Sequence, residues 1–255
     1  MKIFFLGTCA GTEPMPDRKH TSFALDVGGD IYWFDAGEGC SHTAHNLGID
    51  LLKVKKVVIS HPHIDHTGGL ANLIWNIRKM HWVKQSAAMD DIDIYLPAPG
   101  IWEGVMGLLH CSEGSFALED HLHPLPIREG VLFDDGNVRV TALHNLHVAP
   151  REGQWLSYSF LIEANGKRLV YSGDVKHYSE LNPLIGDSCD GLIIETGHFG
   201  IDDVYAYVKD RPVGKVFFTH NGREILNNPE ASNEKVSRYF GTRAVICRDG
   251  MAITL

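Results

Sequence analysis

The residues best suited to chemistry gather in one short motif, where three histidines and an aspartate follow the spacing H-x-H-x-D-H: His61, His63, Asp65 and His66. The motif comes directly after the β-branched run Val57-Val58-Ile59. Neutral imidazole and carboxylate are ligands that suit zinc, manganese or iron. A strand that ends in a tight loop can aim the first two histidines at one metal ion and the Asp-His pair at a second position beside it. The motif therefore predicts a metal site.

Four ligands from one loop cannot complete two metal sites, so further ligands must come from the ends of later strands. His144 and His147 both follow the alternating run around Val140, and the residue pattern alone leaves both open. Asp174 and His220 each follow an apolar run typical of a buried strand. A carboxylate has two oxygens and can bridge two ions, which an imidazole cannot do. Asp174 therefore has the chemistry of a shared ligand.

Strands must position these side chains, and the sequence predicts many of them. Three pairs of β-prone runs are separated by short turns, which predicts hairpins: Ser22–Val27 with Ile31–Asp35, Val131–Phe133 with Val138–Ala142, and Trp155–Ile162 with Lys167–Tyr171. Further strands are expected at Val57–Ser60, Ile92–Leu96, Gly191–Ile194, Val216–Thr219 and Ala244–Cys247.

Helices are fewer. Apolar residues spaced i, i+3, i+4 and i+7 predict a helix that leaves the metal motif near Gly69: Leu70, Leu73, Ile74 and Ile77. Other helices are expected near Ile101–Leu109, Ile201–Lys209 and Asn233–Tyr239. Because no linker, repeat or low-complexity stretch divides the chain, we expect a single domain over residues 1–255.

The composition is that of an ordinary globular protein. Of the 255 residues, 44% are hydrophobic and 22% are charged. No apolar run approaches the roughly 20 residues that a membrane-spanning helix needs, and the N-terminal segment Met1–Leu6 is too short for a secretory signal. Five cysteines without a C-x-x-C pair indicate reduced thiols. We therefore expect a cytoplasmic protein without a membrane partner.

The net charge of −9 argues against a general nucleic-acid-binding protein, which would carry a basic surface. Divalent cations at the metal motif would offset part of this charge locally, so a small anionic substrate is compatible with the acidic balance. The sequence leaves the oligomeric state open, and a homodimer is one of the alternatives.

The motif and the order of the other runs resemble the metallo-β-lactamase superfamily. The other sequence motifs of that superfamily follow in the same order along this chain, at Phe4–Thr8, Phe34–Gly39, Leu146-His147, Tyr171–Asp174 and Phe217–His220. The resemblance covers essentially the whole chain. Its details are closest to the ribonuclease Z-like branch, including the small phosphodiesterases that accompany the carbon–phosphorus lyase system. It implies an α/β fold, the αββα sandwich, in which two packed sheets are covered by outer helices.

The resemblance also implies a centre for two divalent metal ions, with zinc or manganese expected and iron as a further option. Three imidazoles would hold one ion, two imidazoles and a carboxylate the other, and one carboxylate would be shared: His61, His63 and His147; Asp65, His66 and His220; and Asp174. Positions left open for water and substrate would make the centre catalytic.

Two details come with this ligand set. In the superfamily the first ligand after this motif follows a V-x-A-type strand and comes just past an apolar residue, which favours Leu146-His147 over His144. Asp35, at the end of a strand, would buttress the metal loop by hydrogen bonding and would not bind metal itself.

Two catalytic residues are expected beside the metal ions, Asp65 and His198. Two neighbouring cations lower the pKa of a bridging water, so a metal-bridging hydroxide is the expected nucleophile, with Asp65 near it. The ribonuclease Z-like branch has a histidine in a loop before a helix at the station of His198, where it contacts the scissile phosphate and protonates the leaving oxygen. An ordinary solvent-exposed loop histidine is the open alternative.

The leading function is a phosphodiesterase that acts on a small or cyclic phosphodiester. Ribonuclease Z enzymes that process tRNA carry a long basic arm between the stations of His147 and Asp174, and this chain has no room for one. A tRNA 3′-processing endoribonuclease is therefore less favoured. The main alternative is a lactonase or other acyl hydrolase of the same fold, which would not need His198.

Several other residues carry weaker signals. His121 and His123 have ligand-like spacing without partners nearby, so we expect them at the surface or in the core. His177 and Arg151 follow ligand stations and are candidates for substrate contact. The polar stretch Ser112–Asp120 is a candidate flap, and three tryptophans are expected in the core or the pocket wall: Trp75, Trp82 and Trp102.

Overall fold

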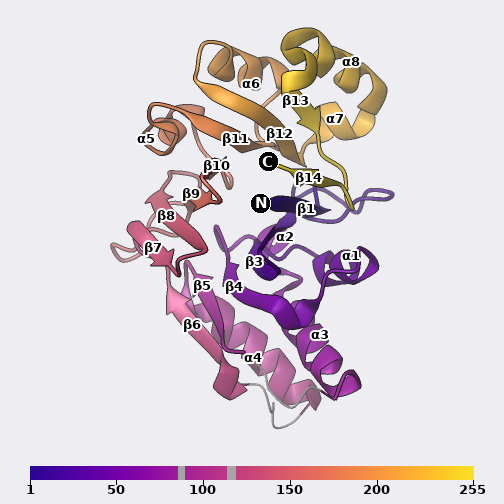
Figure 1. The fold of residues 1–255 in the computed structure, drawn as a ribbon, viewed down its shortest axis with the longest axis vertical. Coiled ribbons are helices and arrows are strands. Elements are labelled where there is room, and N and C mark those ends of the chain that lie inside the picture. Colours follow the sequence, from indigo (N-terminus) through magenta and orange to yellow (C-terminus); the bar gives the residue numbers. More distant parts are fainter. Residues whose placement is uncertain (86–89, 114–118) are drawn as a thin grey trace.

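Two sheets form the frame of the protein in a computed structural model that describes residues 1–85, 90–113 and 119–255 (Figure 1). Within these residues each sheet has seven strands. The first sheet has the order β14 (Ala252–Thr254), β1 (Lys2–Gly7), β2 (Ser22–Val27), β3 (Asp30–Phe34), β4 (Val54–Val58), β5 (Ile92–Leu96) and β6 (Leu122–Pro126). The second has the order β13 (Ala244–Ile246), β12 (Val213–Asn221), β11 (Cys189–Thr196), β10 (Lys167–Tyr171), β9 (Tyr158–Ala164), β8 (Val138–His144) and β7 (Gly130–Asp134).

Each sheet combines antiparallel strands with a parallel block. The strands β3, β4, β5 and β6 run parallel in the first sheet, and β10, β11, β12 and β13 run parallel in the second. Ligands of α/β proteins bind outside the carboxyl ends of parallel strands, where the connecting loops gather. Each block therefore offers one edge at which a site can form.

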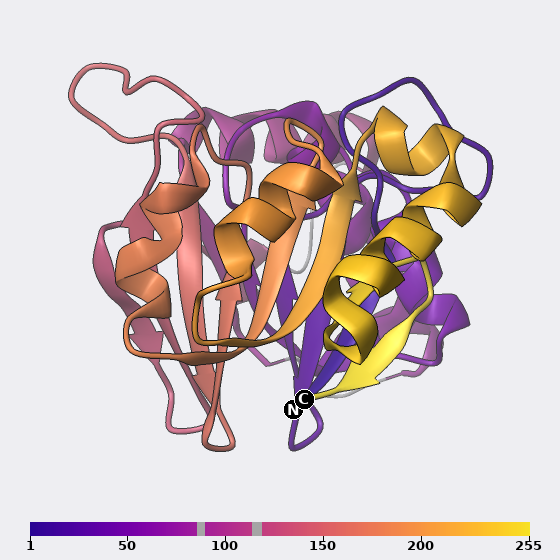
Figure 2. The same ribbon diagram turned by 90° about the horizontal axis from the view of Figure 1, so that it is seen from above.

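Helices cover the outer face of each sheet, so the layers follow the order helix, sheet, sheet, helix (Figure 2). The first sheet is covered by α1 (Cys40–Asn46), α3 (Leu70–Val83) and α4 (Pro99–Glu113). The second is covered by α5 (Asn182–Ile185), α6 (Ile201–Val208), α7 (Arg223–Asn227) and α8 (Pro229–Phe240). This arrangement confirms the expected αββα sandwich. None of the helices in the described ranges combines the length and the apolarity needed to cross a membrane.

An aromatic layer fills the space between the two sheets. Phe23 and Phe34 stack with their ring centroids 4.9 Å apart, and Tyr171 of the second sheet meets Phe23 edge-on, also at 4.9 Å. These rings are fully buried together with Phe160 of β9. Burial of large rings is a major source of stability. Because this layer joins the two sheets, we propose that residues 1–255 form a single domain.

Most strands form where the sequence predicts them, and β2, β5 and β10 have the expected bounds. β9 begins at Tyr158 and not at Trp155, whose ring stacks on His144 with centroids 3.9 Å apart. β4 ends at Val58, because the chain then turns so that Ser60 can hydrogen-bond to Asp35. The chain therefore leaves the sheet just before the metal motif.

Other features differ from the predictions. The edge strand β6 was not expected because it contains Pro124 and Pro126, which lack the N–H that a central strand would need. The prediction of a core or pocket position for Trp82 is wrong, since 73% of this residue is exposed at the end of α3. Most of the candidate flap Ser112–Asp120 lies outside the described residues, in positions 114–118.

Candidate metal centre

The metal motif lies in the turn between β4 and the first sheet's helical layer. His61 follows the end of β4, His63 caps the short helix α2 (Ile64–Thr67), and Asp65 and His66 belong to α2. The backbone of this turn packs on the loop after β3, because the Ala36 N–H donates to the His66 carbonyl at 2.7 Å. The motif is therefore fixed against the neighbouring parallel strand.

Asp35 holds the motif from behind. This buried residue has a left-handed backbone, with φ 53°. Its Oδ1 accepts the Ser60 N–H at 2.6 Å, and its Oδ2 accepts the Ser60 hydroxyl at 2.8 Å and the Tyr171 hydroxyl at 2.5 Å. The Nδ1–H of His66 donates to the same Oδ2 at 2.8 Å. This bond directs the other ring nitrogen of His66, Nε2, to the centre of the site, as expected of a buttressing carboxylate.

One group of converging atoms includes three imidazoles and a carboxylate. The His63 Nδ1 lies 3.1 Å from Nε2 of His61 and 3.2 Å from Nε2 of His147. Both Nε2 atoms also face Oδ2 of Asp174, at 3.7 Å from His61 and 3.6 Å from His147. One ligand atom from each of the four residues falls within 4.8 Å of all the others, close enough to hold one metal ion.

A second group lies beside the first. The Oδ2 of Asp65 is 3.1 Å from Nε2 of His220 and 3.4 Å from Nε2 of His66. Asp174 faces this group too, with Oδ2 3.2 Å from His220 and Oδ1 3.4 Å from His66. Asp174 therefore lies between the two groups. The structure brings all the predicted ligands together, and their binding of metal remains a prediction.

Two buried atoms show that the residues fit metal ions. Among the described residues, neither Nε2 of His66 nor Oδ1 of Asp174 has a hydrogen-bond partner. His66 is fully buried and Asp174 is 2% exposed. Buried polar atoms without partners are costly and therefore rare. An imidazole lone pair and a carboxylate oxygen that face each other are both satisfied by a divalent cation.

The protonation states of His61, His147 and Asp174 suit metal ligands. By contrast, nearby carboxylates outweigh burial and raise the pKa of His66 and, to about 10, that of His220, so a metal ion would displace a proton from these two rings. Burial lowers the pKa of His61 well below its ordinary value and lowers the pKa of His147, so both rings are neutral at pH 7. Burial alone would raise the pKa of Asp174, but the nearby His220 and His66 outweigh this effect and hold the pKa well below the usual range. Neutral imidazole and ionised carboxylate are the forms that bind metal.

Local backbone features aim His220 into the site. The register between β11 and β12 shifts at Thr196, so His220 lies in a bulge, and its own φ is 45°. Bulges commonly redirect a side chain next to an active site. Gly197 leaves room for the ring: a Cβ at this position would lie 2.3 Å from the His220 Nδ1.

His198 lies at the rim of the cluster and is held by a carboxylate that the sequence analysis missed. Its ring is half-exposed, and its Nδ1–H donates to Oε2 of the buried Glu195 at 2.8 Å, which raises the pKa of His198. The same ring nitrogen is 3.8 Å from Oδ2 of Asp174. Glu195 lies at the end of an apolar strand, and Asp174 closely follows one, so an acidic residue after an apolar run was the signal that could have identified Glu195.

A cavity of about 200 Å³ opens at the cluster. Besides the cluster residues, its walls include a segment of the loop after β1: Ala10, Gly11 and Thr12. The Ala10 N–H donates to the Asn221 carbonyl at 3.2 Å, which ties this loop to the residue after His220. The cavity suits a small group of a substrate.

The remaining histidine candidates lie elsewhere. His144 faces Glu129, with 3.1 Å between Nδ1 and Oε2, and joins none of the metal-compatible groups of the described residues. His121 and His123 pair with Asp91 at the edge of the first sheet, at 2.9 and 3.5 Å, and are partly exposed. His177 begins a 3₁₀ turn and is exposed.

Arg151 does not line the cavity at the cluster. It is exposed in a tight turn of the loop that follows His147, where it pairs through the backbone with Gln154. Its predicted contact with substrate remains untested.

Known proteins share this fold and parts of the sequence. The ribonuclease Z of Methanothermobacter thermautotrophicus is 33% identical over 149 residues, which are 58% of this chain and 45% of that protein. The chain thus spans about half the length of the curated relatives it matches. The crystal structure of the short form of human tRNase Z superposes with a TM-score of 0.73 at 20% identity, over 100% of this chain and 99% of that one. A diphosphatase from the PhnP family gives 0.68 at 14% identity, over 100% and 97%.

Fold and cluster together define a metal-dependent hydrolase of the metallo-β-lactamase superfamily, in its ribonuclease Z-like branch. Both the superfamily and the branch agree with the resemblance found in the sequence. The family model described as "Anti-Pycsar protein Apyc1" matches residues 1–206, and the chain belongs to this family.

We predict that His147→Ala lowers the metal content of the purified protein and that His144→Ala does not. Only the His147 ring converges on the other donor atoms, whereas His144 faces Glu129. Elemental analysis of both variants, prepared with the same added metal, measures the difference. A larger loss from His144→Ala would show that the wrong histidine has been assigned.

Gly197→Ala should also reduce metal content, because the added Cβ would displace the His220 ring from its place beside Asp65. The matched control is Gly107→Ala on α4, where a Cβ has no neighbour within 4 Å. Circular dichroism checks that both variants fold, and elemental analysis counts the ions. Equal metal content in the two folded variants would contradict the requirement for this ring position.

Proposed function

We propose that the protein is a phosphodiesterase that hydrolyses a small or cyclic phosphodiester with the help of two divalent metal ions, zinc or manganese. The observation that carries this proposal is the position of His198, at the rim of the metal cluster and hydrogen-bonded to Glu195 at 2.8 Å. A protonated imidazole at this place can supply the proton that an alkoxide leaving group needs. A thioester hydrolase has no comparable need for it, because a thiolate leaves without protonation.

The proposed ligands are divided between two metal ions, one for each of the two groups of converging atoms. His61, His63 and His147 would hold one ion, and Asp65, His66 and His220 would hold the other. Asp174 would be shared, because its carboxylate faces rings of both groups. When bound, two such ions supply a nucleophile from water at neutral pH and stabilise negative charge on the phosphate. Asp65 is proposed to orient the attacking water, since its carboxylate lines the cavity.

His198 performs the remaining proton transfer in this proposal. Its Nδ1 is engaged by Glu195, which leaves Nε2 as the nitrogen that can donate to the leaving oxygen. The raised pKa, caused first by the hydrogen bond to Glu195, favours the protonated ring. Glu195 is itself fixed by the Val175 N–H, which donates to its Oε1 at 2.8 Å.

The size of the site supports a small substrate. The cavity at the cluster measures about 200 Å³, which is below the range of about 300–1,000 Å³ that is usual for drug-sized ligands. We therefore place a phosphate group with its immediate substituents there. Unpaired thiols at all five cysteines support a reducing, cytoplasmic location.

Cleavage of RNA is the second candidate, because the curated relatives are named ribonuclease Z. The net charge of −9 argues against RNA as the substrate, because proteins bind the phosphate backbone through basic surfaces. The interval between His147 and Asp174 is also largely occupied by β9 and β10, so it offers no long basic arm that could hold a tRNA.

A hydrolysis panel on purified protein with added zinc or manganese tests the reaction class. We expect turnover of bis-p-nitrophenyl phosphate and of 2′,3′-cyclic nucleotides, with phosphomonoesters, simple lactones and a precursor tRNA as poor substrates. Lactone turnover faster than that of every diester would transfer the assignment to an acyl hydrolase. Preferential cleavage of the tRNA would transfer it to a ribonuclease.

Loss of His198 should affect good and poor leaving groups differently. For a diester with an alkoxide leaving group we expect His198→Ala to lower kcat by about 10²- to 10⁴-fold. The loss should be much smaller for a p-nitrophenolate leaving group, which needs little protonation. Metal content, measured in the same sample, should be unchanged because His198 is not a proposed ligand. An equal and small loss for both substrates would return His198 to the role of an ordinary loop residue.

A further inference from the structure

A buried hydroxyl group, that of Ser60, lies directly behind the metal motif. The side chain is fully buried, and its Oγ lies 2.8 Å from Oδ2 of Asp35 and 3.0 Å from Nδ1 of His61. The backbone of Ser60 is fixed from both sheets. Its N–H donates to Oδ1 of Asp35 at 2.6 Å, and its carbonyl accepts the N–H of Tyr158 on β9 at 3.1 Å. The hydroxyl therefore has a fixed place between the buttressing carboxylate and a proposed metal ligand.

The number of hydrogens in this contact decides the direction of each bond. The Asp35 carboxylate is surrounded by donors and acts as an acceptor, whereas a hydroxyl has one hydrogen to donate. Ser60 gives this hydrogen to Asp35, so its oxygen is left as an acceptor for His61. The Nδ1 of His61 must then carry the hydrogen of the ring. The other ring nitrogen, Nε2, keeps its lone pair and faces Oδ2 of Asp174 at 3.7 Å.

Asp35 thereby reaches one ring in each of the two groups of converging atoms. It accepts directly from His66 at 2.8 Å, and it reaches His61 through the Ser60 hydroxyl. His66 belongs to one group and His61 to the other. An imidazole that binds metal through one nitrogen usually donates its other N–H to a fixed acceptor, which sets the orientation of the ring. The hydroxyl is such an acceptor for His61.

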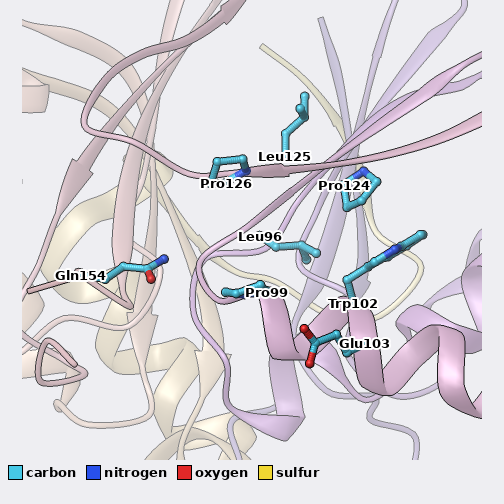
Figure 3. A pocket seen from close by; sticks show the side chains of 8 residues that line it. All are labelled: Leu96, Pro99, Trp102, Glu103, Pro124, Leu125, Pro126 and Gln154. Atoms are coloured by element: carbon cyan, nitrogen blue, oxygen red, sulfur yellow. The ribbon is translucent and has the colours of Figure 1, made fainter. Parts of the chain in front are cut away.

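The Ser60 hydroxyl lies behind the site and not in its open walls. The described residues that line the cavity at the cluster do not include Ser60. It is also absent from the lining of a second, mostly apolar cavity of about 400 Å³, in which Leu96, Trp102 and Pro124 lie (Figure 3). An effect of this hydroxyl on the site therefore passes through His61 and not through contact with a substrate.

We propose that Ser60 is a positioning residue of the metal centre, because its hydroxyl extends the buttress of Asp35 to His61 and fixes this ring with Nε2 toward its metal position. The inference rests on the proposed ligands and is independent of the substrate. One carboxylate orients a ligand of each ion in this arrangement, His66 directly and His61 through Ser60.

Competition for zinc between a chelator and the loaded protein tests the proposal. We expect Ser60→Ala to weaken the binding of one ion about tenfold, as for loss of a partner of a metal-binding histidine, and to leave the other ion nearly unchanged. Asp35→Asn should weaken both ions, because an amide replaces one acceptor oxygen by a donor. Asparagine tolerates the left-handed backbone at this position, where φ is 53°.

The matched control is Ser232→Ala, which removes another buried hydroxyl, bonded to the Glu224 carbonyl at 3.2 Å, and should leave both ions unchanged. Circular dichroism checks that every variant folds. Unchanged affinity for both ions in folded Ser60→Ala would overturn the proposal. Equal weakening of both ions in this variant would overturn it too, because the hydroxyl would then not act through His61.

A spectroscopic measurement tests the contact itself. In zinc-loaded protein with nitrogen-15-labelled histidine, the Nδ1–H proton of His61 is identified by its absence in His61→Ala. Its resonance should shift upfield in Ser60→Ala, where the hydrogen bond is lost, and stay in place in Ser232→Ala. An unshifted resonance in Ser60→Ala would contradict the contact. Two bound ions with the expected shift, but without hydrolysis of any diester, would overturn the phosphodiesterase and support the role of Ser60.

Discussion

The charge of Asp174 is the constraint on which the site depends. This carboxylate is 2% exposed, and its Oδ2 faces four imidazole rings within 4 Å: His61, His147, His198 and His220. Its Oδ1 faces a fifth ring, that of His66, at 3.4 Å without a hydrogen bond. A buried charge is tolerated only where other groups compensate it. The surrounding imidazoles compensate the charge in part, and divalent ions held between this carboxylate and rings that bind as neutral imidazoles would complete the compensation.

The sandwich fold explains how residues far apart in the sequence reach this carboxylate. The parallel blocks of both sheets direct their carboxyl ends to the site, where β4, β10, β11 and β12 each deliver a side chain. The buried layer between the sheets fixes the distance between those ends. Asp35 joins the layers chemically as well, because its carboxylate accepts hydrogen bonds from Ser60 of the first sheet's loop and from Tyr171 of the second sheet.

The sequence alone predicted the parts of the site that depend on local spacing. The H-x-H-x-D-H motif is contiguous, so its geometry follows from one turn. Asp174 and His220 were found because each comes after an apolar run. Glu195 has the same local pattern but was missed, since nothing in the sequence shows that its strand, β11, lies between β10 and β12. The edge strand β6 was hidden by its prolines, and the role of the Ala10–Thr12 segment in the cavity depends on a contact with Asn221 that only the tertiary structure shows.

Counting the metal ions per chain tests the central claim most directly. Elemental analysis of protein prepared with added zinc or manganese should find two ions in the wild type and in Asp187→Ala, which removes an exposed carboxylate. Asp174→Ala should lose both ions together, because it removes the carboxylate that faces both groups. One ion or none in the wild type, or two ions retained after Asp174→Ala, would contradict a dinuclear centre built around this carboxylate.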